Sequence, residues 1–169
     1  MDNNKDCLKF IIQRYDTYIS NSNTKGSFLL SLNAVILTLC VSNLTKIFED
    51  QAGCKIISII LVSILLASGI MAIVFVVRAL YPFTSSGSSH LSKYSSNIFF
   101  GSVRKYRTPK EYWDSINSST DTEFEEDMAR QAYTLAVGLD KKFRFLKIAS
   151  WFIYVDLFAI MGIFLNKIL

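Results

Sequence analysis

The sequence predicts an all-α membrane protein with three transmembrane helices and a small helical cytosolic body. Apolar residues make up 51% of the chain and gather in blocks, as in membrane spans. Three blocks are each about 20 residues long, which is enough to cross roughly 30 Å of hydrocarbon. A helical pattern also runs without interruption into the last block. We therefore expect one long helix from residue 120 to residue 167.

The composition excludes several classes of protein. A chain of 169 residues suits one compact unit, and a net charge of +4 does not by itself imply a nucleic-acid polymer as partner. The three cysteines are far apart and there is a single histidine, so no disulfide framework or zinc motif is present. Motifs for a serine nucleophile, a P-loop, a zinc protease or a dinucleotide site are absent. We expect no enzyme, no metal and no cofactor.

The N-terminal segment, residues 1–25, is predicted to be a cytosolic amphipathic helix. Its polar start, with no early apolar core, does not resemble a signal peptide. Two interpretations of its apolar face compete: it packs on the cytosolic body, or it lies on the membrane surface. The polar run 20–24 should break the helix. The apolar face contains Leu8, Ile11, Ile12, Tyr15, Tyr18 and Ile19.

The first span is predicted at residues 26–46, between Lys25 and Lys46. It carries several small polar side chains, which are typical of a span that faces other protein. After an external loop, 47–55, the second span covers residues 56–78, and Pro82 ends its helix.

Residues 79–147 are predicted to form a cytosolic sensing region. A loop rich in serine, 84–96, precedes a short aromatic turn at 97–101. Thr108 as N-cap and Pro109 at the first helical position then open a short helix.

The long helix begins at Thr120, which forms a capping box with Glu123. Gly138 is the weakest point of its interior and is our candidate hinge. The third span follows at residues 148–166. The expected apolar stripe before it is Phe124, Met128, Ala132, Leu135, Leu139, Phe143 and Leu146.

Most basic residues at the ends of the three spans fall on the same side of the membrane: Lys25, Arg78 and the cluster at 141–147. Positive charge marks the cytosolic side, so the N-terminus and residues 79–147 should be cytosolic and the C-terminus external. A cytosolic body this small favours a homo-oligomer.

An ionisable residue, Asp156, lies inside the third span and is a functional candidate for that reason. Counting from the cytosolic ends, Asn33, Ser68 and Asp156 lie at a similar depth, roughly 12 to 15 Å in. We predict an intramembrane polar layer of these three residues. It either fixes helix packing by hydrogen bonds or takes part in pore lining or gating.

Basic and aromatic residues also recur on the cytosolic side. Arginine and lysine could hold a phosphate while aromatic rings stack a base. Residue types alone favour a simpler role, attraction of juxtamembrane charge to anionic lipid. The residues are Asn97, Phe99, Phe100, Arg104, Lys105, Arg107, Lys141, Lys142 and Arg144.

Three segments together resemble the transmembrane effectors of bacterial Pycsar antiphage defence. The first runs from Tyr15 through Lys25 to Asn33, with Gly26 where those effectors more often have alanine or serine. The second is the turn 97–101. The third consists of Asp127, Gln131, Leu135, Lys141, Lys142, Phe143 and Leu146.

The resemblance implies a cognate cyclase that makes cyclic CMP or cyclic UMP on infection. The effector would respond to that nucleotide and compromise the inner membrane, which causes growth arrest or death of the infected cell. Gln131 then joins the basic and aromatic residues as a candidate ligand contact. The alternative is a ligand-independent membrane adaptor or scaffold that binds a cytosolic protein. The third alternative is a secreted-context toxin or a transporter subunit, and the lack of an inverted repeat disfavours the transporter.

Overall fold

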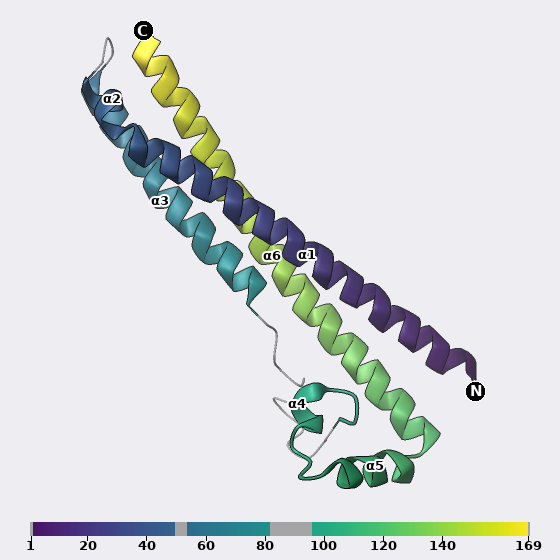
Figure 1. Cartoon of the computed structure of the whole chain (residues 1–169). Helices are drawn as coiled ribbons and strands as arrows, with labels where there is room; N and C mark the ends of the chain where they lie inside the picture. The colour runs from purple at the N-terminus through teal and green to yellow at the C-terminus, as the bar shows by residue number, and fades with distance from the viewer. Residues whose placement is uncertain (1, 50–53, 82–95, 169) are drawn as a thin grey trace. The chain divides into compact units, whose positions relative to one another are not determined.

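The structure is a computed structural model that describes residues 2–49, 54–81 and 96–168. Every regular element in these ranges is a helix (Figure 1). The bounds are α1 Asp2–Ser42, α2 Leu44–Glu49, α3 Lys55–Leu80, α4 Phe100–Val103, α5 Pro109–Ser118 and α6 Asp121–Ile168. Within these ranges, α1, α3 and α6 are long and apolar enough to cross a membrane. The all-helical prediction with three spans is confirmed.

The chain divides into two compact units. One unit contains Met1–Asn21 and Pro82–Asp140, and we call it the polar unit. The other contains Ser22–Tyr81 and Lys141–Leu169, and we call it the span unit. Helices α1 and α6 each contribute residues to both units. At 1.5 Å per residue, the 48 residues of α6 extend roughly 70 Å.

The predicted break at residues 20–24 is wrong, because α1 is one helix of 41 residues. Serine and asparagine are weak helix formers, but packing offsets that preference. Ser22 is buried, and Asn23 accepts a hydrogen bond from Lys142. At Gly26 an added Cβ would lie 2.9 Å from Leu80 Cδ2, so this helix is held close to its neighbour.

The loop predicted at 47–55 begins with helix rather than coil. Helix α1 ends at Ser42, where the Asn43 side chain donates to the carbonyl of Leu39. Helix α2 then follows immediately, and Ile47 N–H donates to the Asn43 carbonyl. The rest of this predicted loop lies partly outside the described residues, as does the predicted loop 84–96 apart from its last residue.

The span unit is packed through residues that recur every three or four positions on its helices. On α3 the buried positions are Ser58, Val62, Leu65, Ser68, Gly69, Ala72, Val76 and Ala79. Small residues predominate, and small side chains allow helix backbones to approach closely in a membrane. Large exposed side chains such as Ile60, Ile64 and Ile70 occupy the other faces of α3, which suits contact with lipid.

The short helices of the polar unit begin where local sequence predicts them. Thr108 caps α5, and its hydroxyl accepts from Glu111 N–H at 3.1 Å. The capping box of α6 is present too: Thr120 N–H donates to Glu123 at 2.7 Å, and Glu123 N–H donates to the Thr120 hydroxyl at 3.3 Å. Both predicted helix starts are therefore confirmed.

The predicted apolar stripe of α6 is wrong at one position. Met128, Ala132, Leu139 and Leu146 are buried, whereas Phe143 is 43% exposed. Lys142 is buried in its place at 8% exposure, because the buried face steps from residue 139 to 142 and then to 146.

We expect Gly69→Val to lower the free energy of unfolding in detergent by about 1–3 kcal/mol, as overpacking does. A Cβ at this position would lie 2.6 Å from Leu37 Cδ2. Ala67→Val is the matched control, since Ala67 is exposed on the same helix. Thermal unfolding followed by circular dichroism measures both; equal melting temperatures would contradict close packing at Gly69.

Candidate functional site

Asn97 is the centre of a hydrogen-bond network in the polar unit. Its N–H donates to Asp127 Oδ2 at 2.8 Å, and its carbonyl accepts from the Tyr112 hydroxyl at 2.8 Å. Its side-chain amide donates to Ser119 Oγ at 3.1 Å, while its Oδ1 accepts from the Tyr106 hydroxyl at 2.8 Å. This network ties the segment before α4, the segment before α5, α5 itself and α6 together.

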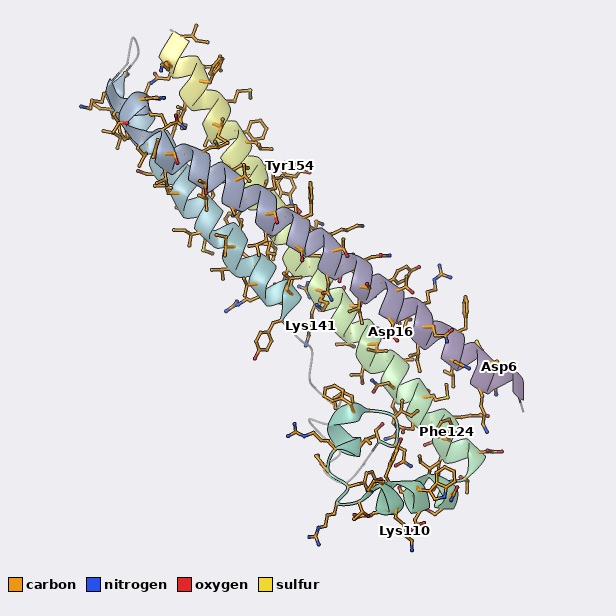
Figure 2. The ribbon with its side chains drawn as sticks, viewed as in Figure 1. Asp6, Asp16, Lys110, Phe124, Lys141 and Tyr154 are labelled. Carbon is orange, nitrogen blue, oxygen red and sulfur yellow. The ribbon has the colours of Figure 1, made fainter. Side chains whose placement is uncertain are left out.

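The network borders a polar pocket of about 290 Å³. One wall comes from the α4–α5 region and α5, and the other comes from the first two turns of α6. Figure 2 labels one lining residue, Phe124, on α6. The lining residues are Asn97, Tyr106, Ser115, Ser118, Ser119, Glu123, Phe124 and Asp127. We call this space the Asn97 pocket.

The pocket contains two carboxylates in different surroundings. Asp127 is 4% exposed and accepts the Asn97 N–H. Glu123 is at the surface, and hydrogen bonds from the Thr120 N–H and hydroxyl lower its pKa. Glu123 therefore remains an anionic acceptor beside the pocket at neutral pH.

The predicted basic and aromatic ligand residues fall into both units. Phe99, Phe100, Arg104, Lys105, Arg107 and Gln131 belong to the polar unit, and Lys141, Lys142 and Arg144 belong to the span unit. In the polar unit, Lys105 and Arg107 are exposed on either side of Tyr106 in sequence, and Tyr106 lines the Asn97 pocket. Phe99 is buried and Phe100 is 65% exposed. Their role in ligand binding stays a prediction.

Lys142 has a structural role in the span unit. Its Nζ donates to the carbonyl of Ala79 at 2.6 Å and to Asn23 Oδ1 at 2.9 Å. The ammonium therefore connects α6 to α1 and to one of the last carbonyls of α3, which has no partner within its own helix. In this arrangement Lys142 is engaged by protein acceptors rather than presented to solvent.

The three residues of the predicted polar layer are buried in the span unit. Asn33 and Asp156 are both 0% exposed, and Ser68 is 6% exposed. The Ser68 hydroxyl donates to Asp156 Oδ1, and Asn33 Nδ2 donates to the carbonyl of Gly69 at 2.8 Å. The structure thus joins α3 to α6 and α1 to α3 at adjacent residues of α3. The part of the polar layer in gating stays a prediction.

Two acceptors of this layer have no hydrogen-bond donor among the described residues: Asn33 Oδ1 and Asp156 Oδ2. A buried polar atom left without a partner costs about 1–3 kcal/mol. The layer is therefore less satisfied in this packed arrangement than it would be beside water.

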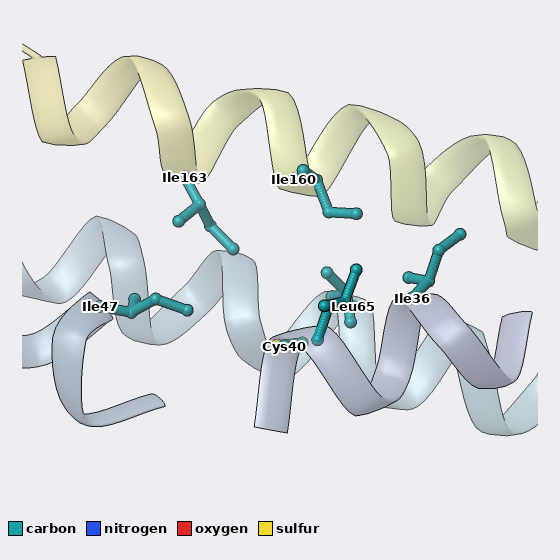
Figure 3. A pocket seen from close by; sticks show the side chains of 7 residues that line it. Ile36, Cys40, Ile47, Leu65, Ile160 and Ile163 are labelled. Atoms are coloured by element: carbon teal, nitrogen blue, oxygen red, sulfur yellow. The ribbon is translucent and has the colours of Figure 1, made fainter. Parts of the chain in front are cut away.

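The span unit also contains a pocket, and this one is apolar. Its volume is about 200 Å³, and Figure 3 shows isoleucine side chains from α1, α2 and α6 around it. Leu65 and Cys40 complete the part labelled in the figure, and Leu39 also lines it. Such a lining suits a hydrocarbon chain and offers no group that would bind a phosphate.

Comparison with known proteins decides the family. The sequence model of the Pycsar effector protein domain matches residues 7–166. The chain belongs to this family. It is similar to the Pycsar effector protein EcPycTM of Escherichia coli, with 25% identity over 158 residues. The aligned region covers 89% of this chain and 85% of that relative. No solved structure matches the chain.

Membership of this family implies a membrane-acting effector role in antiphage defence, and it indicates no enzymatic activity. The resemblance drawn from the three sequence segments is thereby confirmed. The three apolar helices of this chain agree with a place in a membrane.

Sequence reasoning found Asn97 but missed the pocket around it. The pocket residues come from four separate stretches of sequence, and the pair Ser118 and Ser119 indicates only the end of a short helix. The one available signal was Asp127, which the resemblance already singled out. A carboxylate that is 4% exposed needs a nearby donor, and the Asn97 N–H is that donor.

We expect Lys142→Met to lower the free energy of unfolding in detergent by about 1–3 kcal/mol, because Asn23 Oδ1 and the Ala79 carbonyl lose their donor. Lys147→Met is the matched control, as Lys147 is exposed on the same helix. Chemical denaturation in micelles measures the difference. An equal effect of both substitutions would show that the charge, and not these two bonds, matters.

Proposed function

We propose that this protein is a cyclic-nucleotide-activated effector that compromises the bacterial inner membrane during phage infection. The activating ligand is cyclic CMP or cyclic UMP from a cognate cyclase. The N-terminus is cytosolic, the C-terminus is external, and the active form is a homo-oligomer. Growth arrest or death of the infected cell follows from the membrane damage.

One observation supports this function most directly. Helices α1 and α6 each run without interruption from the polar unit into the span unit. A ligand that binds the polar unit can therefore act on the membrane segments through two continuous backbones. Gly138, near the junction of the units in α6, is the candidate hinge of that coupling.

The polar layer supplies a reason why the span unit could have two arrangements. Asn33 Oδ1 and Asp156 Oδ2 lack donors in the packed arrangement, and water would satisfy them in an opened one. A ligand with higher affinity for the opened arrangement then shifts the population toward it. This argument makes Asn33, Ser68 and Asp156 part of the proposed switch.

The test is dye leakage from liposomes that contain the purified protein. We expect cyclic CMP or cyclic UMP to cause leakage, and cyclic AMP and cyclic GMP to cause none at the same concentration. Protein-free liposomes are the control. Leakage that does not depend on any of the four nucleotides would contradict ligand activation and favour a ligand-independent membrane protein.

Asp156→Leu should abolish nucleotide-induced leakage. Leucine has no carboxylate for water to hydrogen-bond, so hydration no longer stabilises the opened arrangement relative to the packed one. Val155→Leu, at an exposed neighbouring position, is the matched control. Nucleotide binding measured by calorimetry should remain, since the change lies in the span unit. Normal leakage from correctly folded Asp156→Leu protein would exclude the layer from the switch.

A further inference from the structure

The Asn97 pocket has few free hydrogen-bond donors. Four hydroxyl groups line it, and each proton is directed at an acceptor inside the polar unit. Tyr106 and Ser115 donate to Asn97 Oδ1 at 2.8 and 3.1 Å. Ser118 and Ser119 donate to the carbonyl of Ser115 at 3.0 and 2.9 Å. These hydroxyls can therefore only accept a hydrogen bond from a ligand without breaking an existing one.

Two other polar side chains of the pocket carry negative charge. Glu123 and Asp127 are both carboxylates, and both lie one helical turn apart on α6. Acceptors and negative charge together disfavour a phosphate, whose oxygens are also acceptors with negative charge. They favour a group that presents N–H or O–H to them, and the ring of Phe124 offers an apolar face beside it.

We propose that the Asn97 pocket binds the nucleoside end of the activating cyclic nucleotide and selects cytosine over uracil. This inference rests on the proposed function. Cytosine has an exocyclic amine with two hydrogens, which Asp127 and Glu123 accept. Uracil has a carbonyl oxygen at that position, and it would face two carboxylates. Cyclic CMP is therefore the ligand, and cyclic UMP is the weaker binder.

The cyclic phosphate then lies outside the pocket. Lys105 and Arg107 are exposed and flank Tyr106, one of the lining residues, so two cations lie next to the pocket in sequence. Arginine and lysine are the side chains that hold phosphate most strongly. In this proposal the carboxylates of Glu123 and Asp127 bind the base, and the cations bind the phosphate.

Calorimetric titration of the full chain in detergent micelles tests the selection, with cyclic CMP and cyclic UMP as the probes. We expect cyclic CMP to bind about tenfold more tightly than cyclic UMP, because a polar site rejects an analogue that leaves its buried groups unpaired. In Asp127→Asn the ratio should fall to about threefold or less, since the new amide presents a donor to uracil.

Two further variants keep the test decisive. Glu123→Gln retains the capping box and should also reduce the ratio, so a folding failure of Asp127→Asn does not end the experiment. Asp114→Asn removes the same charge from an exposed position of α5 outside the pocket, and the ratio should stay at the wild-type value.

Failure of the inference differs from failure of the proposed function. Equal binding of the two nucleotides, or an unchanged ratio in both folded pocket variants, overturns selection by the pocket while nucleotide-induced leakage still supports the function. Absence of both binding and leakage with either nucleotide overturns the function and the inference together.

Discussion

The buried ammonium of Lys142 is the contact that holds together one end of the span unit, where α1, α3 and α6 meet. It bonds to Asn23 of α1 and to the Ala79 carbonyl at the end of α3, while itself belonging to α6. A charge is expensive to bury unless its hydrogen bonds are made, so this site specifies how the three helices meet.

The polar layer, in contrast, makes the packed arrangement of the span unit less favourable. The hydrogen bonds of Ser68 to Asp156 and of Asn33 to Gly69 fix the helices relative to one another. Asn33 and Asp156 nevertheless each keep one acceptor without a donor in the part of the chain that the structure describes. Lys142 at one end of the bundle therefore has two hydrogen-bond acceptors, whereas two buried acceptors in the interior have no donor among the described residues. A bundle built in this way can keep its packing near Lys142, while water would stabilise an opened arrangement of the polar layer.

Local chemistry made the helix starts predictable. The pairs Thr108–Pro109 and Thr120–Glu123 predicted where α5 and α6 begin, because a cap depends on residues within one turn. The continuity of α1 through residues 20–24 was not predictable in that way. It depends on Lys142, Leu80 and other residues far along the chain that pack against this stretch. The Asn97 pocket was hidden for the same reason, since its walls come from segments that only the tertiary fold brings together.

The unbroken course of α1 and α6 constrains how such a chain can change in length. Adding one residue to a helix turns everything beyond it by about 100°. An insertion between the polar and apolar halves of α6 would rotate Asp156 and the residues in line with it away from Ser68. Two added turns, about seven residues, would nearly restore the phase. An insertion within α6 would therefore change the direction of the side chains beyond it as well as the length of the helix. Length variation in chains of this design belongs in the segments outside the long helices, or at their ends.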